Sequence, residues 1–402
     1  MRASKRARTV CGSDAWGFWR SLQSPRFAAA PMVWQSERCF RKLARRNGVE
    51  LAYTPMINAK VFVASYGAPA KEAPTFSSAA RHSGGSLAWR YDSFGNVRDD
   101  VLPLDPEDRP LVMQFCATNA DEFEAAAALA AREFGSCIDM IDLNLGCPQP
   151  SARKARFGAF LMGDPGLVAE MMRRAVAAAA PLPVSAKIRV LESAEATVRF
   201  AQMLEAAGAS AIAIHGRTRA QRHHEGSVHS VTIAAVVQAV GIPVIANGAV
   251  RTRADAEALL ASTGAACCMA ASGLLADVRL FRAPTTVAAA GAADGADAAA
   301  TIDAFGRAFE YLAEARACPP PHHRFVKDHL LALLRDAYLA RSDDPLYHML
   351  VRNARVTELG QYYELTRIMA RREGKVEPEP ERRLLTLKEV KAWGGEARRR
   401  FS

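Results

Sequence analysis

The chain has 402 residues, of which 52 are Lys or Arg and 42 are Asp or Glu, so its formal net charge is +10 with histidine neutral. Half of the residues are hydrophobic and 23% are charged, which excludes the composition of a disordered protein. The basic excess permits a polyanionic partner such as nucleic acid, without proving one. The length fits two or three domains, or one α/β barrel of roughly 250 residues with an appendage.

No stretch predicts a transmembrane helix, because the most apolar one, Ala175–Val184, is interrupted by prolines and is far shorter than the roughly 20 residues that span a bilayer. The eight cysteines are scattered without a CxxC pair or a zinc spacing. We therefore expect reduced thiols of an intracellular protein and no metal site. The acid-free start, Met1–Val10, fits a solvated basic tail better than a targeting address.

From residue 27 onward, short apolar runs alternate with longer segments of helical character, which is typical of βα units around a parallel sheet. Eight such runs are present, and eight strands close a barrel. A doubly wound open sheet is the alternative, but no G-x-G-x-x-G follows the first run. We predict an α/β fold, a (β/α)8 TIM barrel, over residues 27–283. The predicted strands are Phe27–Val33, Leu51–Thr54, Leu111–Cys116, Ile138–Leu145, Val184–Val190, Ala211–His215, Val244–Asn247 and Ala266–Ala271.

The segments between these strands are rich in alanine and carry apolar residues at helical spacing. Gly208 and Gly241 stand where a helix C-cap should precede the next strand. The pattern therefore places helices around the barrel. The predicted helices are Asp121–Phe134, Leu167–Ala179, Ala194–Ala207 and Arg253–Ala261.

Beyond the barrel the composition changes. Residues 284–301 form an Ala/Gly-rich stretch that we interpret as a linker. Leucine and aromatic residues return at helical spacing over residues 302–372, which predicts a C-terminal all-α helical-bundle domain flanked by basic side chains that include Lys327 and His329. Residues 1–26 are interpreted as a basic N-terminal extension and residues 373–402 as a charged, flexible tail.

Polar residues lie at the carboxyl ends of four successive predicted strands. In a (β/α)8 barrel that end is the active face, because the loops that follow the strands converge there. The sequence therefore predicts a functional site on this rim. Its members are Asn144 and Cys147, Lys187 and Arg189, His215 and Arg217, and Asn247.

Two side chains on this rim suggest specific chemistry. The thiol of Cys147 can act as a nucleophile or as a proton donor, since an ordinary pKa of about 8.5 leaves it mostly protonated at neutral pH. The alternative is a small buried hydrophobic residue. Lys187 and Arg189 face the same side of a strand, where a lysine requires an anion or a polar ring, so a cofactor or substrate is implied. The alternative for Lys187 is a structural ion pair or a snorkelling side chain.

The loops after the seventh and eighth strands begin with Asn247-Gly248 and Ala271-Ser272-Gly273. Barrels commonly bind a phosphate group at these two loops. An Asn-Gly pair alone is a weak signal, because it marks ordinary turns, but its position here strengthens it. The rim as a whole suggests a phosphate-bearing cofactor flanked by a lysine, a histidine and a thiol.

Several short motifs occur in order between residue 18 and about residue 281. The most specific is Asn144-Leu-Gly-Cys-Pro-Gln149, and others are Ala30-Pro-Met-Val33, Lys187-Ile-Arg189 and His215-Gly-Arg-Thr-Arg219. Together they resemble the flavin-dependent tRNA-dihydrouridine synthases. The leading segment from Phe18 is most similar to the eukaryotic branch that acts on adjacent D-loop uridines, the 16/17 type.

The resemblance implies an FMN-binding TIM barrel joined to a helical tRNA-binding domain. It implies that NADPH reduces FMN, that reduced FMN passes a hydride to C6 of a D-loop uridine, and that Cys147 is the proton donor to C5. Asn144, Lys187, Arg189 and Arg217 match positions that bind the uridine. The positions that match FMN binding are Pro31, Met32, Val33, Gln114, Lys187, His215, Asn247, Gly248, Ala249, Ala271 and Ser272.

The chain departs from the family pattern at Trp34, Asn58, Ala155 and Ser272. Two alternatives stay open: an FMN-dependent dehydrogenase of a free pyrimidine, which would have no use for a basic helical domain, and a catalytically inactive RNA-binding relative, against which the joint presence of a thiol, a lysine and a histidine on the rim argues. We expect a monomer without membrane or metal partners, located in the cytoplasm or the nucleus, with a mitochondrial or plastid location as the alternative.

Overall fold

The computed structural model describes residues 14–66, 108–221, 225–283, 303–320, 322–338, 344–352, 356 and 358–375. They divide into two compact units, one from residues 1–36 and 49–271 and the other from residues 37–48 and 272–402. The expectations for the basic start, for the linker over residues 284–301 and for most of the charged tail fall outside the described residues.

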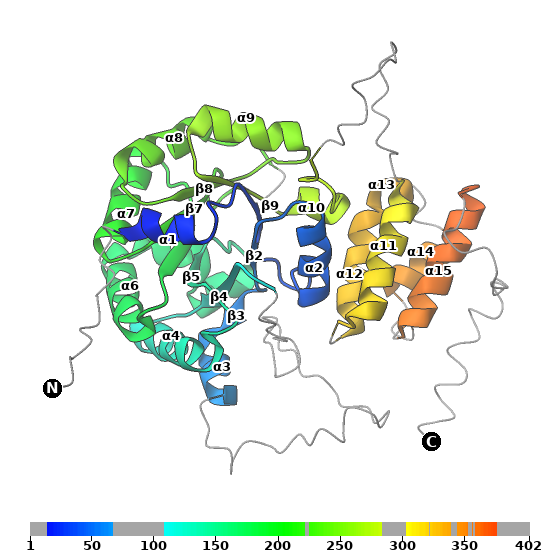
Figure 1. Ribbon diagram of the computed structural model, residues 1–402, viewed down its shortest axis with the longest axis horizontal. Coiled ribbons are helices and arrows are strands. Elements are labelled where there is room, and N and C mark those ends of the chain that lie inside the picture. Colours follow the sequence, from blue (N-terminus) through cyan, green and yellow to red (C-terminus); the bar gives the residue numbers. More distant parts are fainter. Residues whose placement is uncertain are drawn as a thin grey trace. The chain divides into compact units, whose positions relative to one another are not determined.

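Eight parallel strands close into a barrel within the described part of the first unit (Figure 1). Neighbours along the chain pair with one another, β1 pairs with β9, and a pairing of β2 with β4 completes the ring. A further two-residue strand, β3 (Ile57–Asn58), pairs with the end of β4. The predicted TIM barrel is thus confirmed. Its strands are β1 (Phe27–Ala29), β2 (Leu51–Tyr53), β4 (Leu111–Cys116), β5 (Met140–Leu145), β6 (Val184–Arg189), β7 (Ala211–His215), β8 (Val244–Asn247) and β9 (Cys267–Ala270).

The strands are apolar because both of their faces are covered. Every residue of β4, β5 and β6 is buried, as expected for a parallel sheet packed between a barrel interior and an outer ring of helices. Small side chains such as Ala28, Ala211 and Ala213 lie in the interior cluster with larger ones such as Met140 and Met269. The strands are therefore continuous apolar runs in the sequence, because both of their faces are buried.

The predicted barrel helices are confirmed to within about two residues at each end, as α4 (Ala120–Phe134), α6 (Pro165–Ala179), α7 (Ala194–Ala206) and α9 (Arg253–Thr263). Each begins after a side chain that accepts a hydrogen bond from a first-turn N–H group, such as Asn119 before α4. The sequence reasoning did not identify α1 (Ala15–Ser21), α3 (Ala59–Tyr66), α5 (Pro150–Ala155), the 3-10 helix η3 (Gly158–Gly163) and α8 (Ser230–Ala239).

Helix α1 closes the amino-terminal end of the barrel. Trp19, 1% exposed, and Leu22 join the interior cluster, and the indole N–H of Trp16 donates to the carbonyl of Gly241, in the loop before β8, at 2.7 Å. These residues belong to the segment predicted to be an N-terminal extension. The segment is therefore part of the barrel core from residue 15 onward.

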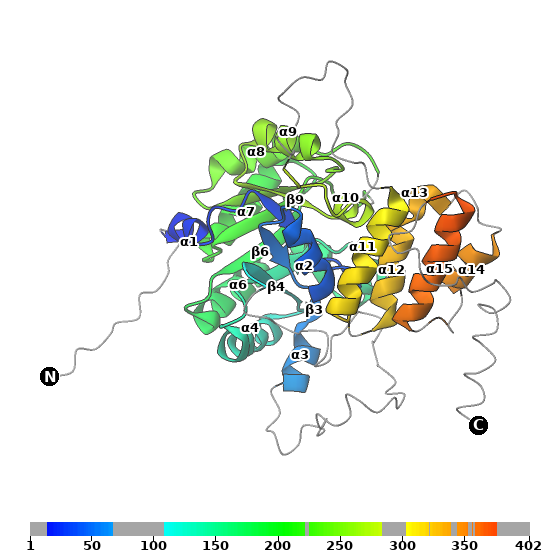
Figure 2. The ribbon, with the colours of Figure 1, turned by 45° about the vertical axis from the view of Figure 1, so that its right-hand side comes forward.

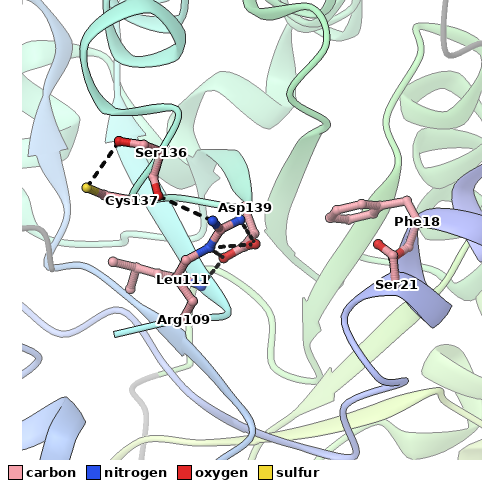
Figure 3. Close-up of polar contacts among 7 residues, drawn as sticks. All are labelled: Phe18, Ser21, Arg109, Leu111, Ser136, Cys137 and Asp139. Carbon is pink, nitrogen blue, oxygen red and sulfur yellow. Dashed lines mark hydrogen bonds and ion pairs between the residues drawn. The ribbon is translucent and has the colours of Figure 1, made fainter. Parts of the chain in front are cut away.

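An ion pair joins the segments that lead into β4 and β5 at the same end. Figure 3 shows the guanidinium of Arg109 facing the carboxylate of Asp139, with Phe18 and Ser21 of α1 on the other side of the view. Asp139 also accepts the backbone N–H of Leu111 at 2.8 Å, and Arg109 donates to the carbonyl of Ser136 at 3.2 Å. The hydrogen bond from Arg109 to Asp139 raises the pKa of the guanidinium, so the contact favours the charged form.

The second unit confirms the predicted C-terminal helices. Figure 2 shows α11 beside α12 and α15. Helix α2 comes from the chain between β1 and β2, yet belongs to this unit and contacts α11. No described helix is both long and apolar enough to cross a membrane. The helices of the unit are α2 (Arg38–Arg46), α10 (Ser272–Ala276), α11 (Ala304–Ala317), α12 (His323–Leu333), α13 (Arg335–Tyr338), α14 (Pro345–Arg352) and α15 (Leu359–Arg372).

A buried polar cluster lies inside this unit. The carboxylate of Glu37 accepts the hydroxyl of Tyr311 at 3.0 Å, and its other oxygen lies 3.1 Å from Nε2 of His329. The ring of Phe40 stacks on His329 with 4.8 Å between centroids. The prediction that His329 belongs to a basic flank is wrong: it is 1% exposed and paired with a carboxylate.

Candidate active site at the carboxyl ends of the strands

The turn that carries Cys147 is held from two sides. Oδ1 of Asn144 accepts the backbone N–H groups of Gly146 at 3.2 Å and of Cys147 at 3.0 Å. The carbonyl of Cys147 accepts the N–H of Ala159 at 3.1 Å. Gly158 has a φ of +66°, and a Cβ atom there would lie 2.7 Å from that carbonyl oxygen. Only glycine therefore fits against the Cys147 turn.

The thiol of Cys147 is partly buried, and burial raises its pKa above the ordinary value. The N–H of Gln149 and the guanidinium of Arg189 act in the opposite direction, because both favour the thiolate. The net shift is upward, so the group is a neutral thiol at physiological pH. The rim thus presents a proton that can be donated, with two groups that stabilise the anion left behind.

Below this turn, three polar side chains are connected inside the barrel. Nδ2 of Asn144 donates to Oε1 of Gln114 at 2.8 Å, and Nε2 of Gln114 donates to Oδ2 of Asp142 at 2.8 Å. Asp142 and Gln114 are fully buried. Burial raises the pKa of Asp142 to about 6, although Ser185, Gln114 and Lys187 all lower it. We call Asp142, Gln114 and Asn144 the amide relay.

Lys187 lies beside the relay on β6 and is 9% exposed. Its ammonium donates to Oδ1 of Asn247 at 3.1 Å, and Nδ2 of Asn247 donates to the carbonyl of Met269 at 2.8 Å. Burial and the neighbouring Arg189 lower the pKa of Lys187 to about 8, while Asp142 raises it. The ammonium is therefore still charged at neutral pH. One of its three N–H donors has a partner among the described residues.

Arg189 connects two loops of the rim. Its Nε donates to the carbonyl of Gly146 at 2.8 Å, and its Nη1 donates to the carbonyls of Thr218 and Gln221 at 2.7 and 3.0 Å. These bonds fix the loop after β5 to the loop after β7. The side chain predicted to bind the uridine thus also holds the loops that surround the thiol.

Arg217 and Gly248 both lie next to the ring of His215. Nη1 of Arg217 lies 3.3 Å from Nε2 of His215, and Nε of Arg217 donates to the carbonyl of Glu225 at 2.9 Å. Gly248 has a φ of +136°, and a Cβ atom there would lie 3.0 Å from Val228 and 3.3 Å from His215. A side chain at residue 248 would therefore crowd Val228 and the histidine, and the positive φ favours glycine there.

Most of the residues predicted for the site meet in these contacts. Met32 instead has its own N–H and carbonyl bound by the hydroxyl of Ser36, at 3.0 Å each, and Ser272 is the first residue of α10 in the second unit. The predicted residues that interact with another member, by contact or, for Arg189, by its charge, are Gln114, Asn144, Cys147, Lys187, Arg189, His215, Arg217, Asn247 and Gly248. Those that take no part in the contacts described above are Pro31, Met32, Val33, Ala249, Ala271 and Ser272.

Among the positions at which the chain departs from the family pattern, Asn58 has a local explanation. Trp34 is 8% exposed and adopts a φ of +65°. Asn58 accepts the N–H of Val61 at 3.0 Å, within the first turn of α3. Ala155 packs against a buried cluster together with Cys147 and Phe160. The members of that cluster are Met56, Cys116, Ala152 and Phe157.

Sequence reasoning did not assign a role to Asp142, Ser185 or Gly158. Asp142 had a visible signal, since it lies between Ile141 and Leu143 in an apolar strand and shares the inward face with Asn144. Gly158 carries no such signal, because a positive φ is not visible in the residue type alone.

The fold and this rim define a TIM-barrel protein whose polar site lies at the carboxyl ends of its strands. The family model described as Dihydrouridine synthase (Dus) matches residues 28–318. The chain belongs to the dihydrouridine synthase family, which confirms the resemblance stated above.

Individual relatives agree with this assignment. The chain is 41% identical over 268 residues to a "tRNA-dihydrouridine(16/17) synthase [NAD(P)(+)]-like" protein of Rattus norvegicus, covering 66% of this chain and 53% of the relative. It is 30% identical to the tRNA-dihydrouridine(16/17) synthase of Schizosaccharomyces pombe, covering 67% of this chain and 60% of that one. It is 35% identical to a human "tRNA-dihydrouridine(20a/20b) synthase [NAD(P)+]-like" protein, covering 63% and 69%. The chain thus spans about half the length of the rat relative.

Proposed function

We propose that this protein is a tRNA-dihydrouridine synthase of the 16/17 type, which reduces the C5–C6 double bond of a D-loop uridine. The observation that carries the proposal is the state of Cys147: a thiol on the active rim of the barrel, kept neutral by burial and held in a fixed turn. Saturating this double bond needs a proton donor at C5, and a neutral thiol supplies one.

The residues around the thiol fit that role. Arrival of a hydride at C6 leaves negative charge on the uracil at C5 and O4, so an acid must stand on the opposite face of the ring. After Cys147 gives up its proton, Arg189 and the N–H of Gln149 stabilise the thiolate. Lys187 and Arg189 are buried cations of the same site, and their charge would stabilise the negative charge that develops on the uracil.

The residues present also fit FMN. The ammonium of Lys187 is buried and uses one of its three N–H donors among the described residues, which suits a polar ring or an anion. Gly248, with a φ of +136°, presents its backbone without a Cβ atom beside His215. Lys187, His215, Asn247 and Gly248 would hold the cofactor, together with the other predicted positions. When bound, FMN reduced by NADPH supplies the hydride for C6.

Support for a tRNA partner comes from exposed charge on the same rim. Arg153, Lys154 and Arg156 lie in and just after α5, next to the Cys147 turn, and all three are exposed. Arg219, also exposed, lies over the ring of Phe160 with its Cζ 5.0 Å from the centroid. Such side chains bind backbone phosphates, so the proposal includes binding of tRNA that weakens steeply with salt.

Two measurements test the proposal. The purified protein should show flavin absorbance near stoichiometry, and a protein that takes up no FMN would contradict any flavin-dependent activity. Dihydrouridine is then mapped in tRNA from cells that lack the gene, complemented with the parent gene or with Cys147→Ala. Dihydrouridine should be lost at the adjacent D-loop positions and restored only by the parent. Unchanged dihydrouridine at every D-loop position would refute the proposal, and turnover of free uracil by the purified protein would indicate a free-pyrimidine dehydrogenase.

A further inference from the structure

One buried charge near the site has no place in the chemistry proposed above. Asp142 is fully buried in the middle of β5, and its two oxygens accept from Gln114 at 2.8 Å and from the hydroxyl of Ser185 at 2.6 Å. A buried carboxylate is costly unless it is well hydrogen-bonded. Asp142 lies below the rim, so any effect it has on the reaction passes through the residues that it contacts.

The direction of the hydrogen bonds shows how it could act. An ionised carboxylate can only accept, so Gln114 must turn its NH₂ group toward Asp142. The carbonyl end of the same amide then faces Asn144, which must present its own NH₂ group. This leaves Oδ1 of Asn144 pointing at the backbone N–H groups of Gly146 and Cys147.

The opposite orientation would disrupt the turn. If both amides were rotated, the NH₂ group of Asn144 would face the N–H groups of Gly146 and Cys147, so donors would face donors. Each buried polar group left without a partner destabilises that arrangement. The acceptor at residue 142 and the two N–H groups of the turn therefore require the same orientation of the relay, and Asp142 secures it at the buried end.

We propose that Asp142 is a positioning residue, which fixes the polarity of the amide relay and thereby holds the Cys147 turn in the geometry that proton donation requires. The proposal rests on the proposed function for its effect on activity. Its structural part, the effect on the cysteine turn, can be measured without any turnover.

The decisive pair of variants is Asp142→Leu and Asp142→Asn, both close in shape to the parent side chain. Leucine removes the acceptor for the NH₂ group of Gln114, so the carboxylate no longer fixes the direction of the hydrogen bonds along the relay. Asparagine keeps an oxygen for Gln114, while its NH₂ group can donate to Ser185, whose own proton has the carbonyl of Ile141 at 3.4 Å as a second acceptor. Gln114→Met breaks the relay at its next member and guards against the case in which Asp142→Leu fails to fold.

Two control variants each remove a hydroxyl group near Asp142 and keep all three members of the amide relay and the hydrogen bonds between them. Tyr53 lies inside the barrel, where Asp142 helps to raise its pKa, and its buried hydroxyl has no hydrogen-bond partner among the described residues. Tyr53→Phe therefore changes the barrel interior and leaves the relay intact. Ser185→Ala removes the other hydrogen bond to the same carboxylate.

The first readout is the rate at which iodoacetamide alkylates Cys147 in the full chain, followed peptide by peptide because other free cysteines are present. The second is dihydrouridine formation on tRNA, separated into kcat and KM. We expect Asp142→Leu and Gln114→Met to alkylate severalfold faster and to lose roughly ten- to a hundredfold in kcat, as misplaced catalytic groups do, with KM unchanged. Asp142→Asn, Tyr53→Phe and Ser185→Ala should match the parent in both readouts.

Parent-like alkylation and kcat in Asp142→Leu would overturn the proposal, and so would equal changes in Tyr53→Phe or Ser185→Ala, which would indicate a general disturbance of the barrel interior. If Asp142→Leu does not fold, parent-like alkylation of Gln114→Met overturns it. If the parent forms no dihydrouridine, the proposed function fails, while the alkylation rates still decide whether Asp142 holds the turn.

Discussion

The two ends of the barrel differ in whether the surroundings favour or disfavour the ionised form of their side chains. At the amino-terminal end, apolar side chains of α1 fill the opening, and the ion pair between Arg109 and Asp139 favours the charged form of its arginine. At the carboxyl-terminal rim and just below it, burial disfavours the charged forms of Asp142, Lys187 and Cys147. The ionised form of a side chain is thus favoured by an ion pair at one end of the barrel and disfavoured by burial at the other. Groups held in this way are characteristic of functional sites.

The largest expected effect is at the rim. Cys147→Ala should lower the rate of dihydrouridine formation by about a hundredfold or more, because general acid catalysis typically contributes about 10²–10⁴-fold. The thermal midpoint should hardly change, since the thiol is only partly buried. Single-turnover measurement on tRNA, with a melting curve of the same preparation, tests both. A fully active variant would remove Cys147 from the chemistry.

The counterpart at the other end is Trp19→Ala. Removing this buried indole should cost about 3–5 kcal/mol in the free energy of unfolding, while activity per folded molecule stays at the parent value. Urea unfolding gives the first quantity and titration of active sites the second. Trp16→Ala is the matched control, because Trp16 in the same helix is 44% exposed and should cost much less. Equal losses would show that α1 does not fill the barrel end as described.

The pH dependence of the free energy of unfolding should reveal that burial disfavours the ionised form of Asp142. Its pKa in the folded chain is about 6, above the ordinary value of 3.8, so the folded state binds more protons between these two values. Stability should therefore fall as pH rises through this window, by about 3 kcal/mol from this group. Lys187, with a pKa of about 8, does not titrate there. Urea unfolding of the parent and of Asp142→Asn from pH 4 to pH 7 should give diverging curves, with the variant gaining toward neutral pH; parallel curves would contradict the assignment.

The smallest effect concerns the ion pair at the amino-terminal end. Asp139→Ala removes the acceptor for the N–H of Leu111 and should cost about 1–3 kcal/mol. The guanidinium of Arg109 is 42% exposed and can be solvated instead, so the ion pair itself adds little. Asp139→Asn, which keeps an oxygen, should cost less. A loss of dihydrouridine formation in either variant, at unchanged fold, would break the division between the two ends.

The barrel and the position of its site could be predicted from the sequence because both depend on local signals. The apolar runs reflect strands buried on two faces, and residues such as Asn144 and Lys187 are found by their place at strand ends. The plug formed by α1 could not be predicted, since nothing local shows that Trp19 enters the barrel. His329 was misassigned for the same reason, because its carboxylate partner, Glu37, lies 292 residues away in the chain. Pairings of that kind depend on tertiary structure alone.

The origin of α2 limits how this protein can be divided. Residues 37–48 belong to the second unit although the chain on both sides belongs to the barrel, so the chain passes from one unit to the other at three places. A fragment that begins at residue 272 would lack Glu37, and Tyr311 and His329 would lose their shared acceptor inside the helical unit. The helical unit is therefore not a cassette that can be cut out or exchanged at one peptide bond; a transplant would have to carry the segment between β1 and β2 with it.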